Sequence, residues 1–302
     1  MKLGTLLLIV CALAVGKIHA QDALVSTQWV AEHLKDPKVR MVEVSVDPGV
    51  YEKGHVQGAV GLAWHSELCD PVRRDILSAE QFQKLCARSG IASDSTVVLY
   101  GDNNNWFAAW AAWTFHLYGH KSVKLMDGGR TKWEAEKRPW DTTVPAPAAA
   151  SYPLPAKVAP LRARLVDVLG VVEGGKPSVL VDVRSPDEFS GKVIAPAGIQ
   201  ELAIRAGHIP GAKNIPWKSV VKDDGTFKDL AVLKEIYAAA GVDGSQPVIT
   251  YCRIGERSSH SWFVLQCLLG YEVKNYDGSW TEYGNAVGVP ITNPAGTVWT
   301  GK

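Results

Sequence analysis

The sequence has few cysteines and almost no net charge. Five cysteines in 302 residues are too few for a disulfide-stabilised scaffold. Lysine and arginine total 32 and aspartate and glutamate 31, so the chain lacks the basic excess of nucleic-acid-binding proteins. No cysteine or histidine cluster has metal-ligand spacing, and no glycine-rich loop matches a nucleotide-binding motif. We therefore expect no nucleic-acid partner, no metal and no cofactor.

The chain also lacks a hydrophobic run long enough to span a bilayer comfortably. Its longest run, residues 3–15, falls short of the roughly 20 residues that a membrane helix needs. The run follows Lys2 and precedes Ile18-His19-Ala20, a pattern typical of a secretory signal. We expect residues 1–20 to be a cleaved signal peptide. The mature protein would then be periplasmic or secreted, without membrane contact; an uncleaved N-terminal anchor is the alternative.

An internal repeat organises the rest of the chain. Hydrophobic residues make up 46% of the sequence, enough for a globular core, and 302 residues suggest about two domains. Three segments recur in the same order in both halves: residues 54–59 with 207–212, 97–100 with 248–251, and 125–129 with 275–279. The spacing of about 150 residues indicates a duplicated domain, because solenoid repeats are much shorter.

A proline-rich segment separates the two copies. Residues 145–160 contain five prolines, each of which removes a backbone donor and excludes a helix interior. We predict an extended, fairly stiff linker over 145–160, a first domain over 21–144 and a second domain over 161–302.

Each half alternates short apolar runs with helical patterns. The segments 79–89 and 231–240 each place apolar residues on one helical face and are followed by a glycine. Strands that alternate with helices predict an α/β fold, in which each domain has a mostly parallel sheet with helices on both faces. Ligands bind such sheets beyond the carboxyl ends of the strands. The residues after Tyr100 and Tyr251 are therefore the places to look for a site.

The two halves differ at this position. Cys252 follows Tyr251, whereas Gly101 follows Tyr100. Arg253 and Arg257 flank the thiol, and a predicted helix begins shortly after it, so positive charge favours a reactive thiolate. Gly255 allows the loop to curl so that its N–H groups point inward, and Ser258 or Ser259 could cap the helix. We expect catalysis in the second domain and an inactive first domain.

The length of this loop distinguishes between chemistries. Cysteine phosphatases use the spacing C-x5-R, whereas here Arg257 closes a C-x4-R loop. A smaller loop suits one extra sulfur atom on Cys252, held as a persulfide by backbone N–H groups.

The chain resembles the two-domain rhodaneses, the thiosulfate sulfurtransferases, over about residues 22–295. The resemblance rests on residues 252–260 with Trp262-Phe263, on residues 205–212, and on residues 277–280. It implies that Cys252 takes the outer sulfur of thiosulfate, releases sulfite and passes the sulfur to a thiophilic acceptor such as cyanide. Arg253 and Arg257 would hold the anionic donor. The implied substrate-binding residues are Arg253, Ile254, Gly255, Glu256, Arg257, Ser258, Arg184, Arg205 and Trp280.

Several features leave the donor and acceptor open. Many relatives carry a second arginine four residues after the position of Arg184, where this chain has Glu188. That difference, with Arg253 in the loop, favours thiosulfate over 3-mercaptopyruvate. The alternatives are a mercaptopyruvate sulfurtransferase, a phosphate-ester or arsenate hydrolase, and a persulfide carrier in a periplasmic relay with a thiol reductant protein.

Other conspicuous residues are predicted to be structural. His55 and His208 occupy equivalent positions in both halves, including the half without a reactive cysteine. His260 and Cys267 follow the loop on the predicted helix, and Trp106, Trp110 and Trp113 recur at helical spacing as core or interdomain residues. The sequence does not decide whether Cys69 and Cys86 form a disulfide.

Overall fold

The computed structural model describes residues 20–196, 198 and 203–298. The predicted signal peptide therefore lies, apart from Ala20, outside the described residues. No helix among the described residues is long and apolar enough to cross a membrane.

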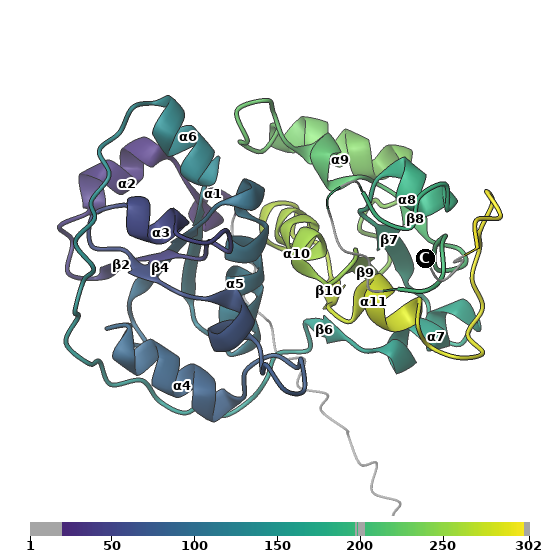
Figure 1. The fold of residues 1–302 in the computed structure, drawn as a ribbon, viewed down its shortest axis with the longest axis horizontal. Coiled ribbons are helices and arrows are strands. Elements are labelled where there is room, and N and C mark those ends of the chain that lie inside the picture. The colour runs from purple at the N-terminus through teal and green to yellow at the C-terminus, as the bar shows by residue number, and fades with distance from the viewer. Residues whose placement is uncertain (1–19, 197, 199–202, 299–302) are drawn as a thin grey trace, which may run out of the picture.

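Two five-stranded sheets form the framework of the molecule (Figure 1). The first has the order β1-β5-β4-β2-β3 and the second the order β6-β10-β9-β7-β8, which is the same topology shifted by five strands. All the strand pairings within both sheets are parallel. The strands are β1 Leu24–Val25, β2 Val39–Glu43, β3 Val60–Gly61, β4 Thr96–Tyr100, β5 Ser122–Met126, β6 Arg162–Ala163, β7 Val179–Asp182, β8 Lys213–Asn214, β9 Val248–Tyr251 and β10 Val273–Tyr276. The duplicated α/β architecture is confirmed.

Helices cover both faces of each sheet (Figure 1). In the first domain they are α1 Ala20–Ala23, α2 Thr27–His33, α3 Val50–Lys53, η1 Trp64–Leu68, α4 Ala79–Arg88, η2 Asn103–Asn105, α5 Trp106–Leu117 and α6 Gly129–Ala135. In the second they are α7 Leu165–Val172, α8 Pro186–Ser190, η3 Trp217–Val220, α9 Leu230–Ala239, α10 Glu256–Trp262, η4 Phe263–Leu268 and α11 Ser279–Tyr283. The predicted helices over 79–89 and 231–240 correspond to α4 and α9.

Local sequence explains the best-defined elements. Ser78 and Gln81 form a reciprocal capping box that starts α4, and Gly90 follows its end with a positive φ of 67°. Strand β4 is almost entirely buried, because helices cover both faces of a parallel sheet.

The proline-rich segment is extended and packs along the first domain. Ala150 and Ala159 donate backbone hydrogen bonds to Ala87 and Leu117. Tyr152 is buried, and its hydroxyl lies 3.0 Å from the ring Nδ1 of His120. The linker is therefore fixed to one domain along part of its length.

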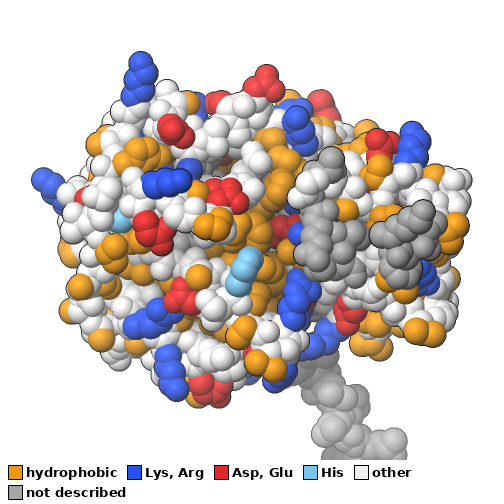
Figure 2. All heavy atoms as spheres, viewed as in Figure 1, with side chains coloured by type: hydrophobic (Ala, Val, Ile, Leu, Met, Phe, Trp, Pro, Cys, Tyr) orange, Lys and Arg blue, Asp and Glu red, His pale blue; other side chains and the backbone are white. Residues whose placement is uncertain are grey.

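The two domains share a hydrophobic core. Helix α5 packs against α10 at the boundary, and the residues of α5 after Trp106 are all buried. Trp106 meets Trp217 of the second domain edge to face at 4.7 Å. Trp106 thus packs between the domains, whereas Trp110 and Trp113 are buried and meet each other edge to face at 5.2 Å, in agreement with the predicted core or interdomain roles. On the face shown in Figure 2, hydrophobic side chains gather along the boundary between the domains, and charges of both signs are interspersed.

Candidate active site

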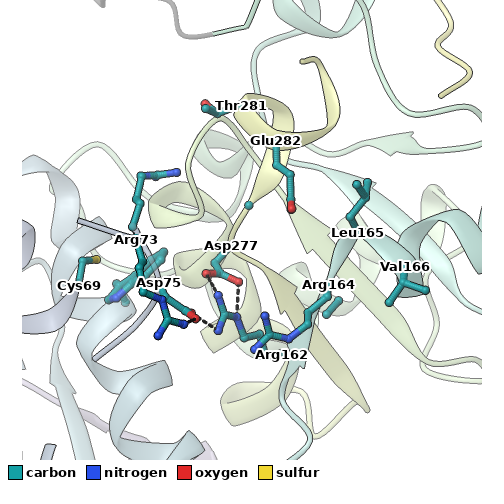
Figure 3. Close-up of a pocket in the computed structure, with 14 residues that line it drawn as sticks. Cys69, Arg73, Asp75, Arg162, Arg164, Leu165, Val166, Asp277, Thr281 and Glu282 are labelled. Atoms are coloured by element: carbon teal, nitrogen blue, oxygen red, sulfur yellow. Dashed lines mark hydrogen bonds and ion pairs between the residues drawn. The ribbon is translucent and has the colours of Figure 1, made fainter. Parts of the chain in front are cut away.

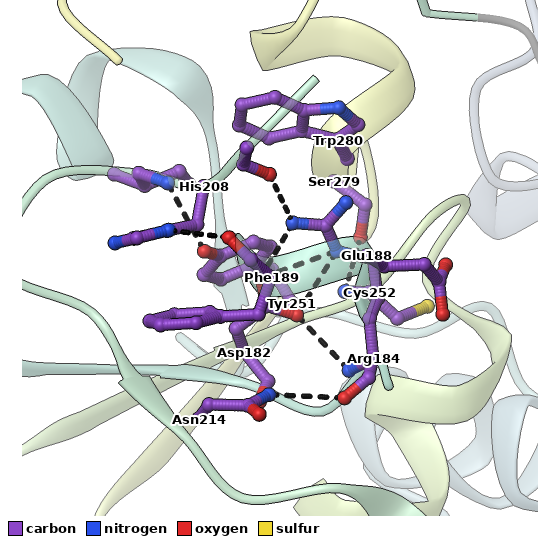
Figure 4. Close-up of polar contacts among 12 residues, drawn as sticks. Asp182, Arg184, Glu188, Phe189, His208, Asn214, Tyr251, Cys252, Ser279 and Trp280 are labelled. Atoms are coloured by element: carbon purple, nitrogen blue, oxygen red, sulfur yellow. Dashed lines mark hydrogen bonds and ion pairs between the residues drawn. The ribbon is translucent and has the colours of Figure 1, made fainter. Parts of the chain in front are cut away.

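Cys252 lies directly after β9, at the carboxyl edge of the second sheet (Figure 4). Its Sγ accepts the backbone N–H of Gly255 at 3.1 Å, so the loop curls around the sulfur. The backbone N–H of Cys252 donates to Ser279 Oγ at 3.0 Å. The residue has no exposed surface. The loop therefore holds the sulfur among inward-pointing donors, as the sequence predicts.

Gly255 is required at the turn between the loop and α10. Its φ of 100° lies in the left-handed region, and it forms the N-cap of α10. A Cβ there would come within 2.5 Å of the Trp110 ring and 2.8 Å of Asp277 Cα. The turn thus depends on glycine both for its backbone angle and for its contact with the first domain.

Ser258 and Ser259 do not cap the helix through their hydroxyls, as the sequence suggested they could. Both hydroxyls donate back to the Gly255 carbonyl, at 3.0 and 2.7 Å. Ser258 Oγ also lies 2.6 Å from Asn275 Oδ1. Asn275 in turn donates to Ser259 Oγ at 2.9 Å, so β10 braces the first turn of α10.

The carboxylate of Glu256 points at the Cys252 sulfur. Cys252 Sγ donates to Glu256 Oε2 at 3.2 Å, and Glu256 is itself buried. Burial raises the pKa of the Cys252 thiol, and the Glu256 carboxylate raises that pKa further, against the lowering effect of Arg257 and of the Ser258 backbone N–H. These surroundings therefore disfavour the thiolate that the sequence predicts. The reason is burial beside a carboxylate, which disfavours a second negative charge.

Arg257 is engaged by Glu188 rather than held ready for a substrate. The guanidinium and carboxylate are joined by two hydrogen bonds of 3.0 Å, and both side chains are buried. Burial works to raise the pKa of Glu188, but the hydrogen bonds and charge of Arg257 outweigh it and hold the pKa below its usual range. The sequence predicted that Arg257 would contact the sulfur donor directly. This geometry instead favours a role in which Arg257 anchors the loop to α8.

The two remaining loop residues face the neighbouring segments. Arg253 is half-buried, and its carbonyl accepts the N–H of Thr281 at 3.0 Å. Ile254 is buried, and its carbonyl accepts a long hydrogen bond of 3.4 Å from Arg74 of the first domain.

Ser279 is a residue of the site that the sequence analysis did not single out. It has a φ of 53°, and its hydroxyl accepts from the Cys252 N–H while donating to the Tyr276 carbonyl at 2.7 Å. Gly129, its counterpart in the repeat, has the same φ of 53°. The repeat held a signal for this role, because Ser279 stands where the other copy has Gly129. A serine in the left-handed region is strained, so its presence there indicates that its hydroxyl makes a needed contact.

Replacing Ser279 by glycine is expected to lower turnover by about tenfold or more, since small displacements of reacting groups cost up to about 10²-fold. Stability should change little, because relief of roughly 1–2 kcal/mol of backbone strain offsets the lost hydrogen bond. Ser279→Ala is the matched control, which loses the same bond but keeps the strain. Thermal unfolding and turnover of both variants test this; equal stability of the two would contradict it.

Three of the residues predicted to bind substrate have structural contacts instead: Arg184, Arg205 and Trp280. Arg184 is 1% exposed and is bound by the Asp182 carboxylate and the Gly207 carbonyl, with its guanidinium 4.7 Å from the Trp280 ring (Figure 4). Trp280 is also 1% exposed and donates to the Arg205 carbonyl at 2.9 Å. The guanidinium of Arg205 donates to four backbone carbonyls, those of residues 283, 284, 286 and 289. All three side chains connect segments around the loop, and the polar groups of all three form hydrogen bonds within the protein.

The first domain cannot hold a cysteine at the equivalent position without rearrangement. A Cβ on Gly101 would lie 2.2 Å from the Val44 carbonyl oxygen. Replacing Gly101 by cysteine would therefore strain this segment, because the atom that the new Cβ would meet belongs to the backbone. The glycine that stands in place of the cysteine in the first domain thus also fits the space available there.

The residues predicted to be structural do have structural contacts. The rings of His55 and His208 stack on Tyr51 and Phe189, and each Nδ1 contacts the carbonyl of the stacked residue. Burial lowers the pKa of His260 to about 3. Cys69, Cys86 and Cys267 are buried free thiols, so Cys69 and Cys86 form no disulfide in this structure.

Comparison with known proteins decides the family. The family described as "Rhodanese-like domain" matches residues 26–136 and 167–286, that is, once in each half. The chain belongs to the rhodanese family. It has 55% identity over 272 residues, covering 89% of this chain and 97% of the relative, with a Mycolicibacterium smegmatis protein named "Putative thiosulfate sulfurtransferase".

Two further relatives have names that describe sulfur transfer. The Thermus thermophilus protein named "Sulfur carrier protein TtuD" is 54% identical over 275 residues, covering 89% of this chain and 96% of the relative. Among solved structures, the 3-mercaptopyruvate sulfotransferase SseA of Escherichia coli superimposes with a TM-score of 0.72 at 26% identity, covering 85% of this chain and 98% of SseA. These similarities support a sulfurtransferase of the rhodanese family.

Proposed function

We propose that this rhodanese is a thiosulfate sulfurtransferase that moves sulfane sulfur to a thiophilic acceptor through a persulfide on Cys252. The observation that carries the proposal is the Cys252 sulfur, fully buried in a loop whose Gly255 N–H points at it from 3.1 Å. Such a nest suits a sulfur anion better than a tetrahedral phosphate, and the C-x4-R spacing supports this over hydrolysis.

In the first half-reaction, the Cys252 thiolate attacks the outer sulfur of thiosulfate. An S–S bond forms to Cys252, the bond between the two sulfurs of thiosulfate breaks, and sulfite leaves with the electron pair. In the second half-reaction, cyanide attacks the outer sulfur of the persulfide, thiocyanate leaves, and the thiolate is regenerated. The loop N–H groups stabilise the sulfur anion in both steps.

The Glu256 carboxylate accepts the proton of the Cys252 thiol. The resting thiol already donates to its carboxylate, so transfer to Oε2 yields the thiolate without exposing Cys252 to water. The negative charge then lies on sulfur rather than on the carboxylate. Arg253, the residue directly after Cys252, would add positive charge that attracts the dianionic donor.

Steady-state thiocyanate formation from thiosulfate and cyanide tests the function. Parallel double-reciprocal lines and a one-sulfur mass gain on thiosulfate-treated enzyme are expected for a persulfide route. The same assay with 3-mercaptopyruvate compares the donors. Failure of the reduced, folded protein to take sulfur from thiosulfate would exclude thiosulfate as donor and favour 3-mercaptopyruvate.

Replacing Glu256 by glutamine is expected to lower the pKa of the Cys252 thiol, because the substitution removes a negative charge beside it. The pH dependence of Cys252 alkylation should then have its midpoint at lower pH than in the wild type. Glu235→Gln, at an exposed position on α9, is the matched control and should leave the midpoint unchanged. A midpoint that stays in place or rises in Glu256→Gln would show that the carboxylate does not act on the thiol.

A protein acceptor is the second candidate, because a relative at 54% identity is named a sulfur carrier protein. In that case the same Cys252 persulfide would discharge to a protein thiol, as in a relay with a reductant.

We also propose that the chain is exported to the periplasm or secreted, on the basis of Lys2 and the apolar run 3–15. The intact mass of the protein recovered from its native cell would show removal of residues 1–20; a full-length cytoplasmic product would contradict export.

A further inference from the structure

Three ion-paired side chains join the two domains beside the active loop (Figure 3). Arg162 donates to the two carboxylate oxygens of Asp277 at 2.7 and 2.8 Å. Its third nitrogen donates to Asp75 of the first domain at 2.6 Å. The donors of a guanidinium form a rigid planar fork, so a guanidinium that is bound on two sides has a fixed orientation. Arg162 therefore fixes the position of Asp277 relative to Asp75.

This group borders a pocket of about 480 Å³ between the domains. Four arginines line the pocket: Arg73, Arg74, Arg162 and Arg164. Arg73 is exposed and pairs with the second carboxylate oxygen of Asp75 at 2.9 Å. Arg74 donates across the boundary to the Ile254 carbonyl of the active loop. The first domain thus reaches the surroundings of Cys252 from two neighbouring residues, Arg74 and Asp75.

The segment 277–281, which follows β10, holds the peptide groups on both sides of Cys252. Ser279 Oγ accepts the Cys252 N–H at 3.0 Å. Trp280 donates its N–H to the Cys252 carbonyl at 3.0 Å. Thr281 donates its N–H to the Arg253 carbonyl, also at 3.0 Å. These peptide planes set the direction of the Cα–Cβ bond of Cys252, and hence the position of its sulfur.

The equivalent segment of the first domain also reaches across the boundary. Asp127 stands where the second copy has Asp277, and it accepts the Phe227 N–H of the second domain at 3.0 Å. Lys132, on the helix that follows, pairs with Asp224 of the second domain at 2.7 Å. Both copies therefore use this part of the repeat for interdomain contact, and in the second copy the same part also holds the loop of the candidate catalytic cysteine.

We propose that Asp75 is a positioning residue for Cys252, so that the first domain takes part in sulfur transfer although it has Gly101 in place of the cysteine. Asp75 orients Arg162, Arg162 orients Asp277, and the segment that begins at Asp277 holds the backbone of Cys252. The inference rests on the proposed function, since its main readout is sulfur transfer to Cys252. Asp75 acts through other side chains, so its loss changes the rate of the reaction step rather than the binding of thiosulfate.

The test uses full-length, sulfur-free enzyme mixed with excess thiosulfate, and it follows the sulfite released in the first turnover against thiosulfate concentration. Asp75→Ala should lower the maximal rate about tenfold, because small displacements of reacting groups cost up to about 10²-fold. Asp75→Asn removes the same charge but keeps an oxygen that can accept from Arg162, so it should recover most of the loss. The two variants should share one half-saturating thiosulfate concentration, which separates positioning from a change in charge.

Lys132→Gln is the matched control, because it breaks the interdomain ion pair beside the equivalent segment of the first domain. It should keep the wild-type maximal rate. Thermal unfolding of all three variants should stay close to that of the wild type, since partly exposed ion pairs contribute little to stability. Asp75→Ala combined with Ser279→Ala should slow the reaction by less than the product of the two single effects, because both substitutions act through the segment 277–281.

A wild-type maximal rate in Asp75→Ala, an equal loss in Asp75→Asn, or an equal loss in Lys132→Gln would overturn the assignment. So would a double variant that shows the full product of the single effects. Failure of the wild type to release sulfite would instead count against the proposed function.

Alkylation of Cys252 by iodoacetamide tests the positioning role without a sulfur donor. The residue has no exposed surface, so the alkylation rate reports opening of the loop. Asp75→Ala should be alkylated faster than the wild type and Lys132→Gln, and equal rates in all three proteins would contradict the role of Asp75.

Discussion

Cys252→Ser is expected to abolish sulfur transfer, with turnover reduced by about 10⁴-fold or more, the usual scale for loss of a covalent nucleophile. A serine hydroxyl ionises far less readily than a thiol and cannot form a persulfide. The variant should fold normally, because oxygen is smaller than sulfur and the Gly255 N–H can still donate to it. Thiocyanate formation and the mass of thiosulfate-treated protein measure the effect.

Cys86→Ala provides the control for the general loss of a cysteine. Cys86 is buried in α4, and burial raises its pKa, so its thiol takes no part in the chemistry. This variant should keep wild-type turnover and lose about 1 kcal/mol of stability from the small cavity. Persistent sulfur loading in Cys252→Ser would assign the persulfide to another thiol.

Glu188→Gln is expected to destabilise the folded protein by about 3 kcal/mol, because it leaves the buried Arg257 without its carboxylate partner. The double variant Glu188→Gln/Arg257→Gln should be less destabilised than Glu188→Gln alone, since it removes the uncompensated charge as well. Denaturant unfolding of both variants and of Arg257→Gln completes the cycle. If the double variant loses the sum of the two single losses, the pair is not coupled.

The same pair predicts a pH dependence of stability. The pKa of Glu188 is held below its usual value in the folded protein, so its stabilisation is present at neutral pH and is lost as the pH falls through the folded-state pKa. Wild-type stability should therefore decline as the pH falls below about 4, the ordinary range for this carboxyl. Glu188→Gln should show a shallower decline, and an identical slope in the two proteins would exclude a contribution from this group.

Much of the site was accessible from the sequence because it is local. Cys252, Gly255 and the start of α10 follow one another along the chain, directly after the buried strand β9. The duplication made the comparison with Gly101 possible, and that comparison led to the prediction that the second half carries the reactive cysteine. The shared topology of the two sheets follows from the same repeat.

The ion pairs and hydrogen bonds of the site were predicted less well, because the partners are distant from each other in the sequence. Arg257 meets Glu188 from α8, and Cys252 meets Ser279 from the turn after β10. Glu256 is close in the sequence, but only burial makes its carboxylate raise the pKa of the thiol instead of being screened by water. Arg184 and Arg205 were expected at the pocket for their charge, yet backbone carbonyls and Asp182 already satisfy them.

By itself, the sequence determined the duplicated α/β fold and located the candidate catalytic cysteine and the tight loop around it, because periodicity, glycine placement and a contiguous motif are properties of neighbouring residues. The tertiary structure alone decided the upward direction of the shift in the pKa of that cysteine, the pairing of Arg257 and the existence of an arginine-lined pocket between the domains. These depend on burial and on through-space distances between residues as far apart as Arg74 and Ile254, which no spacing along the chain specifies.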